Sequence, residues 1–550
     1  MNDISVLTGG RAGDGINSAG LLVAHLFNHM GYQTYMYFDY PSLIKGGHNF
    51  TITRAAGKKI GAHRDRCDYL LALSQDSIEL HRDLMHESTV VLFDSGRVKS
   101  DGQGIAVEAI LKEAEAPAVM GNSCMTGAFA KAAGIPFGVV ESVLRRQTPR
   151  DPDLNLVVAR KGYEAALEER VIPRVGDTCC PLLTGNEVIG LGLLHGGLDA
   201  FVAYPMTPTS NILHFLAGLA KSIPLTVVHP ENEIAVMLMA LGLSYAGKKT
   251  AVCTSGGGFC LMTEGFSLAG GSEVPVVVVM GQRTGPSTGL PTYSGQTDLH
   301  FILHAGQGEF PRLVVAPGDP EQAFAWSSLA LSIAWKCQVP AVILVDKTIC
   351  EGTFSFDEDA LAVPGREAPE PPRETGPYQR YALTASGISP LRHPPVKDAA
   401  IKVNSYIHTE DGITTERADL TVAMTEKRIR KGESLKKEVE QLECVRTSGS
   451  ASADIAILCW GSTFGVCREV ADDLGLKLVQ PIVLSPFPED ILRKALAGVE
   501  TIILVEENAD GQLAMLCARH GLLPEHHIRR FDGRPFTVED LSARVREVRT

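Results

Sequence analysis

Three polar side chains, Thr207, Glu233 and Arg283, each come shortly after an apolar run that is typical of a buried strand. The carboxyl ends of parallel strands meet at one edge of a sheet, where ligands commonly bind. A hydroxyl in a rigid turn can position a substrate, and a guanidinium suits a carboxylate ligand. A carboxylate buried at such an edge acquires a raised pKa. These three residues are therefore the first candidates for chemistry.

The segment around Thr207, "AYPMTPTS", has two prolines that stiffen the turn after the strand. Thr207, Thr209 and Ser210 lie where the next helix should begin. Hydroxyls at helix starts usually accept hydrogen bonds from free backbone N–H groups, and this capping role is the simpler interpretation of each. The rigid turn would also hold the Thr207 hydroxyl at the sheet edge, as a substrate-positioning group requires.

Glu231 and Glu233 precede the helical pattern "IAVMLMALGLSYAG". Both carboxylates suit the positive end of a helix, and both could be surface charges. Residues two apart do not share a helix face, so one carboxylate can face solvent while the other points toward the sheet edge. Burial at that edge would raise the pKa of the second carboxylate.

Two further segments could contribute residues to the same site. In "TSGGGF" a strand-like run ends at Ser255, and the glycines from Gly256 onward permit close approach of a backbone or a ligand. In "VVVVMGQRTGPSTGLPTYSGQTDL" a buried strand runs directly into Arg283. The guanidinium needs a partner, which could be a ligand carboxylate or an internal acid such as Asp298, and the sequence leaves both open.

The glycine-rich stretch at 5–20, "SVLTGGRAGDGINSAG", predicts a turn between a strand and a helix. Such a turn can hold a phosphate, although a carboxylate at Asp14 would repel it unless it points away. A GDG motif for Mg²⁺ and diphosphate needs a later asparagine, but Asn28 comes too early and Asn49 too late. The glycine spacing is not a clean GxGxxG, yet Asp39 lies near the position of a ribose-binding acid. A nicotinamide-dependent dehydrogenase therefore stays open as an alternative.

The 550 residues suffice for three or four domains. Strand-like and helical segments alternate over most of the chain, which predicts an α/β fold with three doubly wound, mostly parallel sheets. We expect domains at 1–175, 186–360 and 451–550, with a linker or surface excursion at 361–450. The basic run "TEKRIRKGESLKKEVE" in the excursion predicts a solvated helix face with i,i+4 charge pairs.

Composition narrows the class of function. A net charge of −13 disfavours binding to nucleic acid or to an anionic membrane. The most apolar run is too short to cross a bilayer and the start shows no signal-peptide pattern, so we expect a cytoplasmic protein. The twelve cysteines include no CxxC, and we expect no metal or iron–sulfur site on this chain.

The four central segments occur in the same order as in the alpha subunits of 2-oxoacid:ferredoxin oxidoreductases. The whole chain resembles the fused form, whose N-terminal gamma domain carries "GGRAGDG" and "YPSLIKGGH". The tail "ILVEENADGQL" resembles the family's transketolase C-terminal-like domain, and "VKDAAIKVNSYIHTEDG" with "MTEKRIRK" resembles the stretch before it. Two positions depart from the family pattern, since Gly257 replaces a usual proline and Thr284 a usual glycine.

The resemblance implies roles for individual residues. The domain at 186–360 would bind the pyrimidine of thiamine diphosphate, with Glu233 hydrogen-bonded to a ring nitrogen so that the cofactor's amino group can remove the C2 proton. Further cofactor contacts would come from Tyr204, Pro205, Ser255 and Gly256. The substrate would be held by Thr207, Arg283 and, from the gamma domain, Lys45. CoA would be approached by Gly10, Gly13, Gly15, Thr209 and Ser210.

The resemblance also implies partners. A beta subunit would carry the diphosphate-binding domain, Mg²⁺ and a [4Fe-4S] cluster, pass electrons to ferredoxin, and form an (alpha–beta)₂ heterotetramer with this chain, which alone should be inactive. The expected reaction is the reversible oxidative decarboxylation of 2-oxoglutarate to succinyl-CoA and CO₂. The alternatives are the same chemistry on pyruvate or a branched-chain 2-oxo acid and, less favoured, the dehydrogenase or a non-catalytic paralogue.

Overall fold

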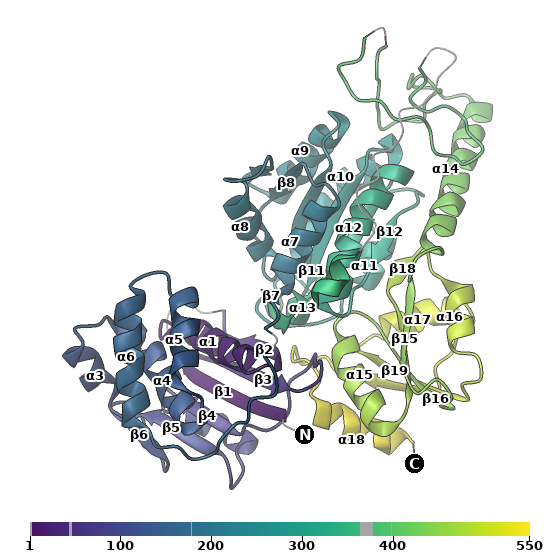
Figure 1. The fold of residues 1–550 in the computed structure, drawn as a ribbon. Coiled ribbons are helices and arrows are strands. Elements are labelled where there is room, and N and C mark those ends of the chain that lie inside the picture. The colour runs from purple at the N-terminus through teal and green to yellow at the C-terminus, as the bar shows by residue number, and fades with distance from the viewer. Residues whose placement is uncertain (1–2, 43–46, 178, 363–377, 398, 550) are drawn as a thin grey trace. The chain divides into compact units, whose positions relative to one another are not determined.

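The computed structural model describes residues 3–42, 47–177, 179–362, 378–397 and 399–549. The chain divides into two compact units (Figure 1). The first unit consists of Met1–Thr184, Glu351–Glu358 and Phe536–Thr550, and the second of Gly185–Cys350 and Asp359–Pro535. Three sheets of eight, seven and five strands confirm the predicted α/β class with three sheets. The expected domain boundaries stay a prediction.

The first unit holds the eight-stranded sheet. Its parallel half contains β6 (Gln103–Ile105), β5 (Val90–Asp94), β4 (Tyr69–Ala72) and β1 (Asp3–Arg11) in that order. The order continues antiparallel through β3 (His48–Ala56), β2 (Gln33–Asp39), β14 (Thr353–Ser355) and β7 (Leu182–Thr184). The helices of this unit with four or more residues are α1 (Ile16–His29), α2 (Asp76–Glu79), α3 (Val107–Glu113), α4 (Gly121–Ala132), α5 (Phe137–Gln147), α6 (Pro152–Ala165) and α18 (Val538–Val548).

The glycine-rich stretch forms the predicted turn between β1 and α1. Gly15, the residue before α1, has φ 73°, a left-handed conformation that suits glycine. The Asp14 carboxylate accepts a hydrogen bond from Arg11 N at 2.8 Å and pairs with Arg97 at 2.9 Å. This carboxylate is therefore held by the turn itself and by a neighbouring cation.

The seven-stranded sheet of the second unit is parallel except at one edge. Its order is β18 (Val483–Ser485), β12 (Leu313–Val315), β13 (Pro340–Asp346), β11 (Val276–Gln282), β10 (Thr250–Ser255), β8 (Ala200–Ala203) and β9 (Thr226–Val228), with β18 antiparallel. Its helices are α7 (Gly185–His195), α8 (Ser210–Leu219), α9 (Glu233–Tyr245), α10 (Gly256–Ser272), α11 (Leu299–His304), α12 (Pro320–Cys337) and α13 (Lys347–Glu351). Every residue of β10, β11 and β13 is buried, as the continuous apolar runs require in a sheet covered on both faces.

The five-stranded sheet shares a hydrophobic core with the seven-stranded one. Its order is β15 (Val445–Gly449), β17 (Lys477–Pro481), β16 (Ile455–Cys459), β19 (Thr501–Glu506) and β20 (His526–Arg529), parallel except for β15. Its helices are α15 (Thr463–Leu474), α16 (Glu489–Ala495) and α17 (Gln512–Arg519). The buried Gln322 and Gln480 amides exchange hydrogen bonds of 2.8 and 3.0 Å between the two parts.

The basic run lies in α14 (Ala418–Val439), the long green helix of Figure 1. The prediction of a solvated face is wrong for Lys427 and Lys431, which are 0% and 1% exposed. Both ammonium groups bind the carboxylate of Glu273, which follows α10 in a left-handed conformation. Burial opposes ionisation of Glu273, but Lys431 and Lys427 outweigh it and hold its pKa well below the usual range. A buried carboxylate thus recruits lysines that a sequence pattern assigns to solvent.

Candidate functional site

The carboxyl edge of the seven-stranded sheet brings together the four central segments. Arg283 Nη1, just beyond β11, donates to the Thr207 carbonyl at 3.4 Å. The Thr209 hydroxyl reaches the Thr254 carbonyl of β10 at 3.2 Å. The Glu233 side chain lies against Gly258, in the first turn of α10. Segments separated by up to 76 residues therefore meet at one edge.

Glu233 is the buried member of the glutamate pair. It is the first residue of α9 and 6% exposed, whereas Glu231 is exposed. Asn232 fixes the start of this helix, because its side chain accepts a hydrogen bond from Ala235 N at 3.0 Å. Within the described parts of the chain, no group donates a hydrogen bond to the Glu233 carboxylate. The carboxylate is therefore available to a ligand.

Gly258 makes room for this carboxylate. A Cβ atom at Gly258 would overlap Thr254 Oγ1 and would lie 2.5 Å from Glu233 Oε1 and 2.9 Å from Glu233 Cγ. Real Cβ atoms do not approach other heavy atoms so closely, so a side chain here would move the carboxylate. The glycine turn thus serves close approach, as its sequence suggested.

The turn before α8 is packed rigidly onto the sheet. A Cβ atom at Gly281 of β11 would lie 2.7 Å from Thr209 Cγ2 and 2.8 Å from Pro208 Cδ. Asn186 Nδ2 donates to the Pro208 carbonyl at 2.9 Å, and the buried Thr209 hydroxyl lies 3.2 Å from the carbonyls of Met206 and Thr254. Thr209 therefore secures the turn, and its assignment to CoA stays a prediction.

The other predicted groups of this edge lie close by. Tyr204, Pro205 and Thr207 are half-buried, and the Tyr204 ring contacts His229 edge-on at 5.9 Å between centroids. The Ser255 hydroxyl is fully buried and has no hydrogen-bond partner in the described structure. A buried hydroxyl without a protein partner is available to a ligand.

Arg283 is half-buried, and its Nε is buried without a partner among the described residues. Burial lowers the pKa of its guanidinium, while the charge of Asp298 opposes this shift. The described chain places no carboxylate within 4.0 Å of the guanidinium, so the internal salt bridge with Asp298 is not formed. A guanidinium with unused donors at a sheet edge suits a carboxylate ligand.

Asp298 itself emerges as a site residue that the sequence presented only as a salt-bridge partner. Burial raises the pKa of its carboxyl to about 7, against the opposing effect of Arg283. An ideal Cβ atom on Gly256 would lie 3.0 Å from Asp298 Oδ1, so the carboxyl faces the first residue of α10. The sequence feature that could have identified Asp298 as a site residue is its position directly after the loop that begins at Arg283.

The loop between Arg283 and Asp298 is held by the part of the unit that contains the five-stranded sheet. Gln296 Nε2 donates to the Trp460 carbonyl at 2.7 Å, and its main chain and amide oxygen pair with the Glu507 main chain, each at 2.8 Å. Gln512 Nε2 donates to the Thr297 carbonyl at 2.8 Å. Sequence reasoning did not identify these glutamines as positioning residues, because their partners are more than 160 positions away.

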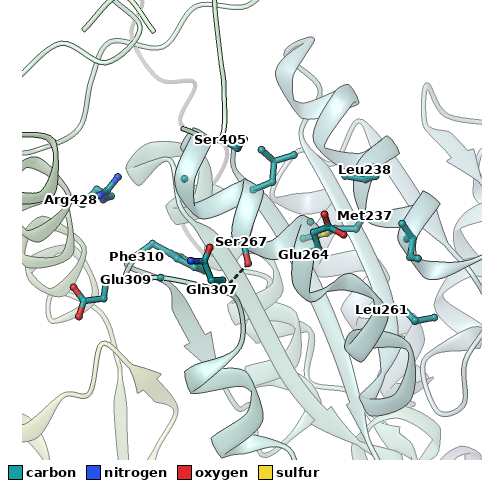
Figure 2. A pocket seen from close by; sticks show the side chains of 15 residues that line it. Met237, Leu238, Leu261, Glu264, Ser267, Gln307, Glu309, Phe310, Ser405 and Arg428 are labelled. Atoms are coloured by element: carbon teal, nitrogen blue, oxygen red, sulfur yellow. Dashed lines mark hydrogen bonds between the residues drawn. The ribbon is translucent and has the colours of Figure 1, made fainter. Parts of the chain in front are cut away.

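A separate cavity of about 510 Å³ lies along the outer faces of α9 and α10 (Figure 2). Leu238 and Leu261 contribute apolar walls, and Phe310 and Arg428 border it from other elements. Gln307 N donates to Ser267 Oγ at 2.7 Å within this wall. The lining includes none of the candidate residues at the sheet edge.

Other predicted residues lie outside the second unit or outside the described residues. Lys45 lies outside the described residues. Gly10, Gly13 and Gly15 belong to the first unit and form the β1–α1 turn. Across the ranges that the structure describes, no cluster of three or more His, Cys, Asp or Glu side chains could hold a metal ion, and no helix is long and apolar enough to span a membrane.

Family models match three consecutive parts of the chain. "Pyruvate ferredoxin/flavodoxin oxidoreductase" covers residues 5–165, "pyruvate flavodoxin/ferredoxin oxidoreductase, thiamine diP-bdg" covers 192–427, and "pyruvate:ferredoxin oxidoreductase core domain II" covers 453–541. A 2-oxoacid:ferredoxin oxidoreductase alpha subunit of Aeropyrum pernix is 28% identical over 100% of this chain and 98% of its own length. The chain belongs to the alpha subunits of the 2-oxoacid:ferredoxin oxidoreductases. This membership removes the nicotinamide-dependent dehydrogenase alternative.

Further relatives of this alpha subunit support the family assignment. That of Saccharolobus solfataricus is 35% identical over 66% of this chain, which spans 61% of the length of that relative. Among solved structures, the 2-oxoglutarate:ferredoxin oxidoreductase from Magnetococcus marinus, with 2-oxoglutarate, coenzyme A and succinyl-CoA bound, superposes with a TM-score of 0.90. It is 28% identical and is covered over 99% of its chain, against 100% of this one.

Proposed function

We propose that this alpha subunit, with a beta subunit, catalyses the CoA-dependent oxidative decarboxylation of 2-oxoglutarate. In the balanced reaction 2-oxoglutarate, CoA and two oxidised ferredoxins yield succinyl-CoA, CO₂, a proton and two reduced ferredoxins. The observation that carries the proposal is the convergence of Thr207, Glu233 and Arg283 at one sheet edge. The full-length likeness to the Magnetococcus marinus enzyme, whose structure holds 2-oxoglutarate and succinyl-CoA, supports the substrate.

The substrate carboxylate would be held by Arg283 and Thr207. The guanidinium offers the buried Nε that lacks a partner, and its planar fork matches a carboxylate in a bidentate pair. Thr207 lies in the stiff turn at Pro205 and Pro208, and its main chain is beside the guanidinium because Arg283 donates to the Thr207 carbonyl. Both groups would therefore orient the carboxylate of a 2-oxo acid.

Thiamine diphosphate fits the donors and acceptors of this edge. The free Glu233 carboxylate could accept from or share a proton with a ring nitrogen, and the orphaned Ser255 hydroxyl could bond a second polar atom. Gly256, Tyr204 and Pro205 would border the same ring. When bound, this cofactor supplies a nucleophilic carbon and an electron sink for decarboxylation. Glu233 would keep a proton shared between its carboxylate and the ring nitrogen, as this chemistry requires.

The remaining components belong to the same proposal. CoA would be approached by Gly10, Gly13, Gly15, Thr209 and Ser210, with Lys45 facing the substrate or CoA. A beta subunit would carry the diphosphate-binding domain, Mg²⁺ and a [4Fe-4S] cluster, and would transfer electrons to ferredoxin within an (alpha–beta)₂ assembly in the cytoplasm. The sequence contains no CxxC, which favours clusters carried by the partner.

The test is a substrate panel on the co-expressed complex, read as CoA-dependent reduction of a viologen dye under anaerobic conditions. We expect 2-oxoglutarate to give the highest kcat/KM. Because the family models carry the name pyruvate oxidoreductase, the second candidate is the same reaction on pyruvate, and a higher kcat/KM for pyruvate would select it. A branched-chain 2-oxo acid completes the panel. Turnover without CoA, or reduction of NAD in place of the dye, would refute the proposal.

A further inference from the structure

Asp298 stands at the residue before α11, where an aspartate ordinarily caps the helix. Its side chain makes no capping hydrogen bond. The carboxyl is instead turned toward α10: an ideal Cβ atom on Gly256 would lie 3.0 Å from Oδ1 and 3.4 Å from Oδ2. Asp298 thus occupies a capping position, but its carboxyl points toward α10 and does not cap α11.

Hydrogen bonds hold the main chain around Asp298 in place. Asp298 N donates to Gln282 Oε1 at 3.2 Å, and the Thr297 hydroxyl donates to the Arg283 carbonyl at 3.0 Å. Gln512 Nε2 holds the Thr297 carbonyl at 2.8 Å from the side of α17. The main chain at Asp298 is therefore fixed at the edge that also carries Arg283.

Two positive features face this carboxyl. One is the Arg283 guanidinium, which acts on it through its charge without forming an ion pair within 4.0 Å in the described chain. The other is the N-terminus of α10, whose first backbone N–H groups have no partner within the helix. These are the features that would attract the carboxylate of a substrate.

Other titratable groups near this edge come from several elements. Glu233 of α9 lies across Gly258 in the same first turn of α10. Asp346 ends β13 opposite Gln282, and its side chain accepts hydrogen bonds from Ser462 and from Ile349 N. His300, in the helix that follows Asp298, bonds the Gln512 carbonyl. Asp298 is thus the acid among them that faces Arg283 and Gly256 together.

We infer that Asp298 is a positioning residue whose charge opposes binding of the substrate carboxylate beside Arg283 and the N-terminus of α10. When ionised, it repels the incoming anion and weakens the positive potential of these two features. When protonated, it no longer repels the anion and donates a hydrogen bond to the bound carboxylate. This inference rests on the proposed function, in which Arg283 binds the carboxylate of a 2-oxo acid.

The inference has a defined pH dependence. Burial raises the pKa of Asp298 to about 7, so the carboxyl changes charge near neutral pH. Above that value the ionised form predominates, and the affinity for an anionic ligand falls by up to about tenfold per pH unit. If ionised Asp298 excludes the ligand completely, the affinity falls by about 30-fold between about pH 6 and about pH 8.5.

The experiment measures binding of oxamate, an unreactive analogue of a 2-oxo acid, to the anaerobic co-expressed complex by titration calorimetry. We expect the wild-type affinity to fall by about 30-fold between about pH 6 and about pH 8.5, and Asp298→Asn to remain within about twofold over this range. Glu231→Gln removes an exposed carboxylate from the start of the α9 segment and should keep the wild-type profile. In turnover, KM for the 2-oxo acid should follow the oxamate profile, and kcat should not.

Three other outcomes would refute the role of Asp298, and one of them would also refute the assignment of Arg283. A flat wild-type profile refutes the role of Asp298 without reference to any variant. Normal oxamate binding with an unchanged pH slope in Asp298→Asn refutes it as well and leaves the proposed function intact. Failure of wild type and Asp298→Asn to bind oxamate at every pH refutes both the inference and the assignment of Arg283 to a 2-oxo acid.

Discussion

Gly257 and Gly258 offer a matched pair of substitutions in the first turn of α10. At Gly257 an added Cβ atom meets nothing within 4 Å. At Gly258 it would overlap Thr254 Oγ1 and approach Glu233 Oε1 to 2.5 Å. The two variants, Gly257→Ala and Gly258→Ala, add the same methyl group one residue apart, and only the second reaches the candidate catalytic carboxylate.

The expected magnitudes follow from these contacts. Alanine in place of glycine within a helix stabilises by about 0.5–1 kcal/mol, and Gly257→Ala should show this gain. Gly258→Ala forces extra volume into a fully packed site, which costs about 1–3 kcal/mol. Relief by the neighbours is limited, because Thr254 is a buried β-branched residue and Glu233 is touched at Cγ as well as at its tip. The carboxylate must therefore shift.

The assay is CoA-dependent dye reduction by the co-expressed complex, together with the thermal unfolding midpoint. A displacement of about 1 Å in a positioning group costs about 10²-fold in rate, so we expect that loss in kcat/KM for Gly258→Ala. Gly257→Ala should retain activity within about twofold, because its added methyl group meets nothing within 4 Å. Full activity of Gly258→Ala would refute the role of the Glu233 position, and an equal loss in Gly257→Ala would locate the effect in the helix start.

Four further outcomes are expected. Glu233→Gln should abolish turnover while the complex still assembles, and substantial residual activity would show that another carboxylate activates the cofactor. The purified chain without its partner should not reduce the dye with a 2-oxo acid, CoA and thiamine diphosphate. Glu273→Gln leaves Lys427 and Lys431 without their carboxylate and should lower the free energy of unfolding in urea by about 3–5 kcal/mol. The control Lys436→Met breaks the partly exposed 3.7 Å pair with Glu440 and should lower it by about 0.5 kcal/mol or less. Because the pKa of folded Glu273 is held below its ordinary 4.5, its contribution to stability is present above that pH and is lost as the pH falls, so Glu273→Gln should flatten the acid limb of the unfolding curve.

The sequence predicted the architecture of the candidate site well. Strand-like runs that end in Gly, Pro or a polar residue place their carboxyl ends together, because parallel strands share a direction. That rule was enough to group Thr207, Glu233 and Arg283, which the structure brings to one edge. The i,i+4 pairs of α14 were also predictable, and Glu426 with Arg430 and Lys436 with Glu440 lie within 4.0 Å.

The sequence could not predict which partner each polar group meets. Lys427 and Lys431 read as solvent-facing charges, but Glu273, more than 150 positions earlier, draws them into the interior. Gln296 reads as a loop residue, yet it bonds Trp460 and Glu507 and so sets the path from Arg283 to Asp298. No local pattern reports such pairs, because each joins segments that meet only when the chain folds.

The chain's residues by themselves determined the α/β class, the family resemblance and the identity of the groups that could do chemistry, since these depend on local periodicity and on motif spacing. Tertiary structure alone decided that Glu233 is buried while Glu231 is exposed, and that Arg283 keeps donors free because Asp298 stays beyond ion-pair distance. Burial and distance between remote segments set charge, pKa and availability, and these quantities exist only once the chain has folded.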